Sequence, residues 1–471
     1  MAEYYFIAAG GTGIRVVIAL LHSCACGALA GDKLHVLVLD SDEDRNAFVL
    51  KEQVRRYGRL RELFQDSHNP DAPNGTLFSA QVDVEVVDKA IRQIGDFSLD
   101  DSTTIQMAWD VSSSPQYAGE DKLFLKALLG NEQVNNTKPS NGLYGCPALG
   151  ALLLKPVIEK DPVMTAGVIT DGKIMHFLNR YDPDMPLAFC ASSFGGTGVA
   201  SILGIWNALG DMNKLPTGEK KAILCLAPYF KVRNNNIDSW DREGVQKKHT
   251  QAKEFFEKYY QGFHRIVEPA QNPLWERGEY IEEKQKNWPD LTEWHAAWIL
   301  GRFFQPDASW RTIKPSDADR DLLERFARLS WVWNEEFEES VRRGKPKLLR
   351  SNALWTQTIP QRRRHMADEP NLLENVMLRE FMMEWQAWYL KMHTQSFGPV
   401  LLDPSLNEDE KCQAEREKEK ETLKSEKEDL RKKCDSDKGY ADLCWELASA
   451  TSYGSKAKLL QTLYDLSKGD N

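Results

Sequence analysis

Short apolar runs and longer amphipathic stretches alternate along the first part of this chain. Five apolar runs have the length of a buried strand: Tyr4 to Ala9, His35 to Leu39, Leu187 to Ala191, Ala222 to Leu226 and His264 to Val267. Apolar residues at helical spacing follow two of these runs, over Ile14 to Cys26 and Val199 to Leu209. Strands that are apolar on both faces and alternate with helices are typical of a parallel sheet covered by helices. The pattern therefore predicts an α/β fold.

The segments between these runs predict further elements. Val82 to Ile94 is predicted to be a helix, and residues 57 to 80 an irregular excursion because of their Asn-Pro and Pro-Asn-Gly turns. Glu243 to Gln261 is predicted to be a helix that carries several aromatic residues. From Pro289 to Phe304, large apolar residues recur at helical spacing, which indicates a helix at the centre of the core.

Strand signals thin out beyond residue 310, and the chain divides into four parts. We expect a parallel-sheet domain over residues 1–305 and a mostly helical second domain over residues 306–400. Residues 401–440 contain a long charged run with too few leucines for a coiled coil, which is typical of a solvated helix or linker. Amphipathic helical spacing returns over residues 441–471.

Charge and composition narrow the classes of partner. The chain has 471 residues and a net charge of -10, whereas a nucleic-acid-binding protein needs concentrated lysine and arginine. No apolar stretch has the length of a membrane span, and Met1-Ala2-Glu3 leads into the first apolar run without a signal peptide. The eight cysteines form no CxxC pair. We therefore expect a reduced, cytoplasmic protein that binds neither nucleic acid nor zinc.

Two glycine loops of similar design are the most informative motifs. Gly10-Gly11-Thr12-Gly13 follows the run that ends at Ala9, and Gly195-Gly196-Thr197-Gly198 follows the run that ends at Ala191 and the pair Ser192-Ser193. A glycine turn between a strand and a helix presents unpaired backbone N–H groups and the positive end of the helix dipole, which together bind phosphate. Two such loops in one chain predict a polyphosphate held between neighbouring turns.

Two further segments also belong to predicted loops. Asp40-Ser41-Asp42 follows the second apolar run, and acidic residues there lie beside the crevice in which open parallel sheets bind ligands. The segment from Gly145 to Gly150 contains a proline and opens another apolar helix, Ala151 to Ile158. The chain therefore carries chemistry-bearing loops after several of its strands.

Neither of two common phosphate-binding motifs, the P-loop and the Rossmann fingerprint, matches both glycine loops. A P-loop needs a lysine and a serine or threonine after its last glycine, and neither loop has them. The Rossmann fingerprint G-x-G-x-x-G begins at Gly11, but Val16 stands at its third glycine. In such a site Asp40 would contact the ribose. An NAD enzyme therefore stays open, although it leaves the second glycine loop unexplained.

The order of the loops resembles that of the tubulin/FtsZ superfamily, and within it the divergent bacterial tubulin-like proteins. That family has a glycine-rich first loop, an acidic loop after strand two, a glycine and proline third loop, and a Gly-Gly-x-Gly-Thr-Gly signature loop. The matching segments are Gly10 to Gly13, Asp40 to Asp42, Gly145 to Gly150 and Ser193 to Gly198. The signature loop is shorter here, with one Gly-Thr-Gly unit. The resemblance covers residues 4 to 305.

The resemblance implies GTP or GDP as the ligand, together with Mg²⁺. The first loop would hold the α- and β-phosphates, and the signature loop the β- and γ-phosphates with help from Ser193 and Thr197. Asp42 would lie near the Mg²⁺, directly or through water. Gly145 and Gly150 would shape the loop that senses the γ-phosphate.

The resemblance also implies residues for the base and for hydrolysis. Asn287, Trp288 and Glu293 would lie near the guanine, although a core position for Trp288 and a solvent-facing Glu293 fit equally well. In this family a loop after the central helix supplies carboxylates to the GTP of the neighbouring subunit. Asp307 is the carboxylate found there, so slow hydrolysis or none is expected.

Two functions follow from the resemblance. The first is a GTP-binding protein that associates with itself head to tail into filaments. The second is a non-polymerising scaffold or sensor, which recruits a partner protein through the helical C-terminal region in a bacterial defence or stress assembly. Bound nucleotide and concentration-dependent assembly distinguish these two functions from each other and from an NAD enzyme.

Overall fold

The computed structural model describes the sheet-forming part of the chain and a few residues beyond it. Described are residues 2–25, 27, 29–40, 45–65, 76–87, 93–94, 97–98, 158, 163–165, 168–170, 172–192, 196–217, 223–227, 250–251, 254, 256–258, 265–267, 296–297, 300–301, 303–304 and 461. The strands are β1 (Glu3–Ala9), β2 (Lys33–Leu39), β3 (Gln81–Val87), β4 (Gln93–Ile94), β5 (Phe97–Ser98), β6 (Val163–Thr165), β7 (Val168–Thr170), β8 (Leu187–Ser192), β9 (Ile223–Ala227) and β10 (Arg265–Val267). The helices are α1 (Gly10–Ala25), α2 (Arg45–Gln65), α7 (Lys173–Arg180) and α8 (Gly196–Asp211).

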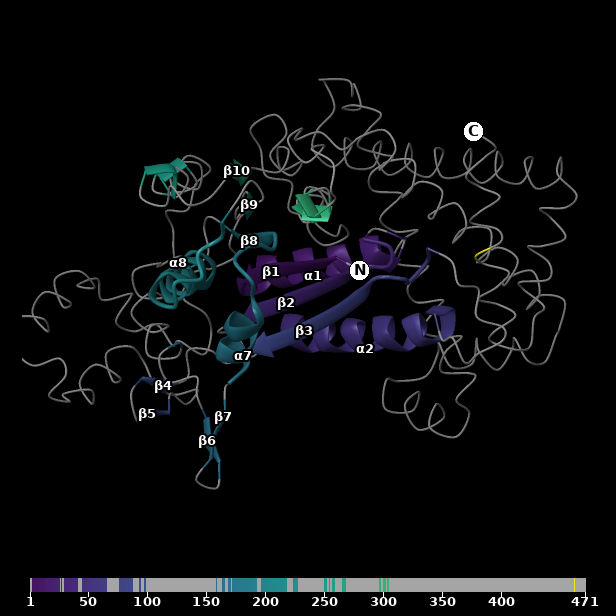
Figure 1. The fold of residues 1–471 in the computed structure, drawn as a ribbon, viewed down its shortest axis with the longest axis horizontal. Helices are drawn as coiled ribbons and strands as arrows, with labels where there is room; N and C mark the ends of the chain where they lie inside the picture. The colour runs from purple at the N-terminus through teal and green to yellow at the C-terminus, as the bar shows by residue number, and fades with distance from the viewer. Residues whose placement is uncertain are drawn as a thin grey trace, which may run out of the picture.

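Six parallel strands form one sheet in the order β10-β9-β8-β1-β2-β3. All five strands that the apolar runs predict are in it, so the predicted α/β class with a parallel sheet is confirmed. From β1 the chain winds outward to β2 and β3, and from β8 it winds the other way to β9 and β10 (Figure 1). The strand order therefore reverses between β1 and β8. Open α/β sheets bind ligands at such a switch point, outside the carboxyl ends of the strands.

The helices that follow β1 and β8 lie on opposite faces of the sheet. The two strands pair in register, with Ala8 opposite Cys190 and Ala9 opposite Ala191. Helix α1 packs on the face of the sheet to which Ala8 belongs, and α8 packs on the other face, at Ala9 and Ala191. Right-handed crossovers that run in opposite directions require this arrangement. The amino ends of both helices thereby reach the same edge of the sheet.

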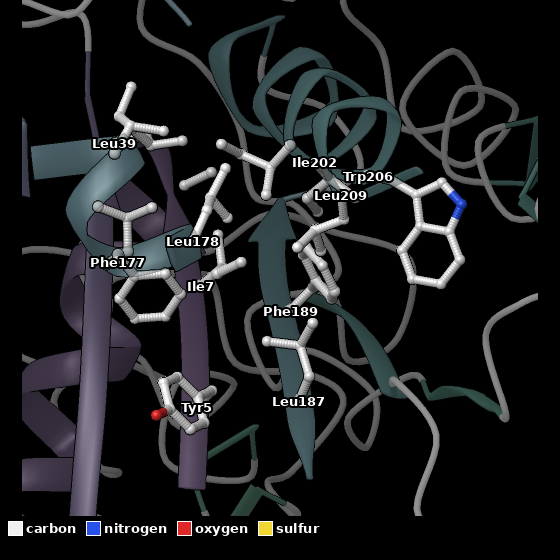
Figure 2. Close-up of a cluster of buried hydrophobic side chains, with 14 of the residues drawn as sticks. Tyr5, Ile7, Leu39, Phe177, Leu178, Leu187, Phe189, Ile202, Trp206 and Leu209 are labelled. Atoms are coloured by element: carbon white, nitrogen blue, oxygen red, sulfur yellow. The ribbon is translucent and has the colours of Figure 1, made fainter. Parts of the chain in front are cut away.

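One hydrophobic cluster fills the space between the sheet, α7 and α8. Figure 2 shows side chains from the two central strands facing side chains of the two helices: Tyr5, Ile7, Leu187 and Phe189 against Phe177, Leu178, Ile202, Trp206 and Leu209. The rings of Phe189 and Trp206 meet edge to face, with centroids 5.9 Å apart. Burial of each large apolar side chain contributes about 1.5–3 kcal/mol. This cluster fixes α8 against β1 and β8.

The opposite face of β1 contacts a helix from much later in the chain. The described residues at 296–297, 300–301 and 303–304 are helical and buried. Phe304 packs on Tyr4 of β1, with ring centroids 5.2 Å apart. The predicted core helix is therefore confirmed over these residues, and the described residues between 250 and 258 are helical as predicted for Glu243 to Gln261. No helix in the described part of the chain is long and apolar enough to cross a membrane.

Two predicted segments are wrong. Gln81–Val87 is the strand β3 and Gln93–Ile94 the strand β4, so Val82 to Ile94 is not a helix. Valines at 82, 84 and 86 alternate with polar residues, which is the period of a strand. The predicted excursion from residue 57 to 80 begins instead inside α2, whose buried residues recur every three or four positions: Ala47, Leu50, Gln53, Tyr57, Leu60 and Phe64.

A residue near the end of the chain contacts the segment between α2 and β3. Gln461 is buried, and its side-chain oxygen accepts a hydrogen bond from the backbone N–H of Leu77 at 3.3 Å. The carbonyl of Leu77 accepts another from Gln65 of α2 at 2.9 Å. The segment 441–471, predicted to be helical, is helical at this described position and reaches the turn that leads into β3.

A cluster of charged groups holds α7 to the start of the sheet. His35 of β2 stacks on Tyr5, and its Nε2 lies 3.2 Å from Glu3. Arg180 of α7 donates to Nδ1 of His35 at 3.1 Å. The neutral tautomer with its proton on Nε2 satisfies both contacts. Burial, together with the positive charge of Arg180, lowers the pKa of His35.

We expect His35 to make stability depend on mild acid. Unfolded histidine takes up a proton near pH 6.5, whereas folded His35 resists it to lower pH. The unfolded state then binds more protons, so stability falls as the pH drops from about 6.5 toward the folded pKa. Glutamine retains a donor and an acceptor but does not titrate. Denaturant unfolding measures the free energy of unfolding at each pH between 7 and 5. This free energy should fall more steeply with decreasing pH for the wild type than for His35→Gln. An equal pH dependence of the two proteins would contradict the lowered pKa of His35.

Candidate functional site

The two predicted glycine loops open neighbouring helices at one edge of the sheet. Helix α1 begins at Gly10, directly after the last residue of β1, and α8 begins at Gly196, shortly after β8 ends at Ser192. Because Ala9 pairs with Ala191, the carboxyl ends of β1 and β8 lie side by side. The described glycines of both motifs form the first turn of the helix, Gly10 to Gly13 in α1 and Gly196 to Gly198 in α8, so these helices begin earlier than the predicted Ile14 and Val199.

The loops come close to each other at Gly10 and Gly198. A Cβ atom on Gly10 would lie 3.6 Å from the backbone nitrogen of Gly198 and 4.0 Å from Cβ of Thr197. Gly10 has a φ of +71°, which residues with a side chain rarely adopt. Glycine at this position therefore allows the chain to leave β1 and enter α1 against the second loop. The first turns of two helices far apart in the sequence therefore lie close together.

Gly13 and Gly198 permit each helix to lie close to the sheet. A Cβ atom on Gly13 would lie 3.0 Å from the carbonyl carbon of Ala8. A Cβ atom on Gly198 would lie 2.9 Å from Cβ of Ala191 and 3.4 Å from the carbonyl oxygens of Ala9 and Ser192. Both strands present alanine at these contacts, so small residues meet on both sides. The close packing of Gly13 on Ala8 and of Gly198 on Ala191 fixes the positions of the first turns of α1 and α8.

The surface formed by the two loops is rich in hydrogen-bond donors. The first turn of a helix leaves up to four backbone N–H groups without partners in the helix, and its dipole is positive there. Neither α1 nor α8 has an acidic residue in its first turn. Thr12 and Thr197 lie within these turns, and each is only 7% exposed. Two amino ends with buried hydroxyls form a surface that attracts anions.

Asp40 is the described acidic residue at the same edge of the sheet. It follows β2 directly and is 3% exposed, and its backbone N–H donates to the carbonyl of Val87 at 3.1 Å. The neighbouring Asp42 lies outside the described residues. Among the residues that the structure describes, no three His, Cys, Asp or Glu side chains are grouped to hold a metal ion.

Other predicted site residues also lie outside the described part of the chain. These are the remaining members of the loops, the residues expected near the base and the expected catalytic carboxylate: Gly145, Gly150, Ser193, Gly195, Asn287, Trp288, Glu293 and Asp307. The described site therefore consists of Gly10, Gly11, Thr12 and Gly13 of α1 together with Gly196, Thr197 and Gly198 of α8.

Arg15 is a site residue that the loop motifs do not identify. It lies on α1 just after the loop, is half-buried, and donates from Nη2 to Oγ1 of Thr12 at 3.3 Å. Side chains on a helix point back toward its amino end, so a residue three positions after Thr12 covers the loop. This direction rule is the sequence signal that could have found it.

Comparisons with known proteins add no assignment. No family model matches this chain, and neither curated proteins nor solved structures give a match.

We predict that Gly198→Ala destabilises the protein by about 1–3 kcal/mol, because the added methyl group meets Ala191 and two backbone oxygens. Gly58→Ala is the matched control. Gly58 is exposed on α2 with nothing within 4 Å of its Cβ position, so alanine there should leave the free energy of unfolding unchanged or raise it by about 0.5–1 kcal/mol. Urea unfolding measures the free energy of unfolding of both variants. Equal stability of the two variants would show that α8 does not pack closely on β8.

Proposed function

We propose that this chain binds a purine nucleoside triphosphate, GTP, with its phosphates between the amino ends of α1 and α8. The observation that carries this proposal is the close approach of Gly10 to Gly198 and Thr197 at the switch point of the sheet. A single helix terminus offers donors to one phosphate group. Two termini this close together offer donors to adjacent phosphates of one polyphosphate, and Gly10 places no side chain between them.

The positions of the glycines support this placement of the phosphates. Gly10 turns with a positive φ, and Gly13 and Gly198 let α1 and α8 lie close to β1 and β8, where a Cβ would collide with Ala8 or Ala191. The first turns of both helices are thereby brought near each other, and in this proposal phosphate oxygens reach their N–H groups. Bound triphosphate carries Mg²⁺, which keeps most of its waters and takes few protein carboxylates. In this proposal Asp42 is the carboxylate nearest to that ion.

The tubulin/FtsZ resemblance accounts for both loops, whereas a dinucleotide site needs the first loop alone. The strand order also occurs in dinucleotide-binding sheets, and Asp40 stands where their ribose-binding acid would be. This second candidate, an NAD enzyme, leaves the close approach of Gly10 to Gly198 without a role. The proposed GTP site uses both loops at this point, and it is therefore preferred.

The proposed biological role is self-association of a cytoplasmic protein. In tubulin-like proteins one subunit covers the nucleotide of the next, and such head-to-tail contacts extend into filaments when they do not close. Hydrolysis in this proposal is slow or absent, with Asp307 as its one candidate carboxylate. A non-polymerising scaffold that recruits a partner protein through the C-terminal region uses the same nucleotide site without self-association.

The first test identifies the ligand. Purified protein is denatured, the released nucleotide is separated by chromatography, and refolded or apo protein is centrifuged with Mg²⁺-GTP at increasing protein concentration. We expect guanine nucleotide in the supernatant after denaturation, and protein in the pellet above a critical concentration with GTP but not with GDP. Asp307→Ala then tests whether any hydrolysis depends on that carboxylate.

Other outcomes discriminate between the candidates. Guanine nucleotide without sedimentation supports the scaffold and rejects the filament. Release of NAD, or ligand binding that survives Gly196→Trp, contradicts a phosphate site that uses both loops. Gly58→Ala is again the control for handling and folding, because its position on α2 is open to solvent.

A further inference from the structure

Arg15 stands out among the residues of the two helices that form the proposed site. Together α1 and α8 contain one arginine or lysine, which is Arg15. They contain one acidic residue, Asp211, at the carboxyl end of α8. Most of α1 is buried and apolar, so a guanidinium group is costly there unless it is held at the end of the helix. Arg15 is held at that end.

The guanidinium of Arg15 is directed at the phosphate loop. Its Nη2 lies 3.3 Å from Oγ1 of Thr12, the residue between Gly11 and Gly13. Thr12 is only 7% exposed, whereas Arg15 is half-buried. A hydroxyl that accepts from arginine still has its own proton to donate. Arg15 and Thr12 thus place a positive charge and a donor next to the backbone N–H groups of α1.

We propose that Arg15 binds the phosphates of the ligand and makes the site select polyphosphates over ligands with fewer phosphate charges. The inference rests on the proposed nucleotide site and adds to it the residue that recognises charge. The two loops supply backbone donors, which bind any phosphate group. Arginine supplies a full charge and a planar pair of donors that fits phosphate oxygens. Affinity then increases with the number of charged oxygens on the ligand.

The test measures equilibrium binding of four probes with Mg²⁺: GTP, GDP, GMP and inorganic tripolyphosphate. Arg15→Gln should weaken GTP and tripolyphosphate on the order of 10- to 100-fold, with a smaller loss for GDP and little for GMP. Arg15→Lys keeps the charge but not the paired donors, so its affinity for GTP should be intermediate. Arg59→Gln is the matched control, because Arg59 forms an exposed ion pair with Glu62 on α2 at 2.9 Å.

The outcomes separate this inference from the proposed function. If the wild-type protein binds none of the probes, the nucleotide site is wrong and the role of Arg15 is wrong with it. If the wild type binds GTP and Arg15→Gln binds it equally well, the role of Arg15 alone is wrong. If Arg15→Gln loses the same fold of affinity for GTP and for GMP, Arg15 binds phosphate but does not select ligands by their number of phosphate charges.

A second measurement needs no variant. Phenylglyoxal modifies accessible arginines in the wild-type protein, and mass spectrometry reports the extent at Arg15 and at Arg59. We expect tripolyphosphate to protect Arg15 and to leave Arg59 unchanged. Modification of Arg15 at the same rate with and without saturating tripolyphosphate would overturn the inference, whatever the folding of the variants.

Discussion

The arrangement of the site depends on how closely α1 and α8 approach the two central strands. Gly13 lies against Ala8 and Gly198 against Ala191, with no room for a side chain at either contact. Larger residues would push the helices outward and separate their first turns. Because β1 and β8 are hydrogen-bonded neighbours, both turns then lie close together at Gly10 and Gly198. Small residues in the strands and helices thus place two sets of backbone donors at one point.

Helices α1 and α8 contribute both to the hydrophobic core, through their apolar side chains, and to the candidate site, through the small residues of their first turns. Residues 199 to 209 of α8 bury large apolar side chains against β1 and β8, whereas its first turn consists of glycine and threonine. The same division applies to α1. Burial holds each helix, so its first turn is fixed in place before a ligand binds. Such preorganisation lowers the entropic cost of binding, and the charge of Arg15 is carried on this rigid support.

Periodicity predicts β1, β2, β8, β9 and β10 of the parallel sheet and fails at β3 and at α2. The central strands β1, β2 and β8 each contain a long apolar run, so these runs are unambiguous. Strand β3 alternates valine with Gln81, Asp83 and Glu85, and a longer window conceals that period. Helix α2 is rich in arginine and glutamate, and its buried residues are spread over many turns. The two motifs predict that the loops are neighbours, but the residues at which they approach each other, Gly10 and Gly198, could not be predicted, because strand order arises from pairing between distant segments. Arg15 was missed because it lies outside the glycine motif.

A crystal structure of the protein with a slowly hydrolysed GTP analogue and Mg²⁺ tests most directly whether the first turns of α1 and α8 bind the same ligand. A site built from both loops predicts phosphate oxygens within hydrogen-bond distance of backbone nitrogens from Gly10 to Gly13 and from Gly196 to Gly198, with Arg15 on the same phosphates. A ligand that contacts one loop alone, or that binds elsewhere on the protein, would contradict it.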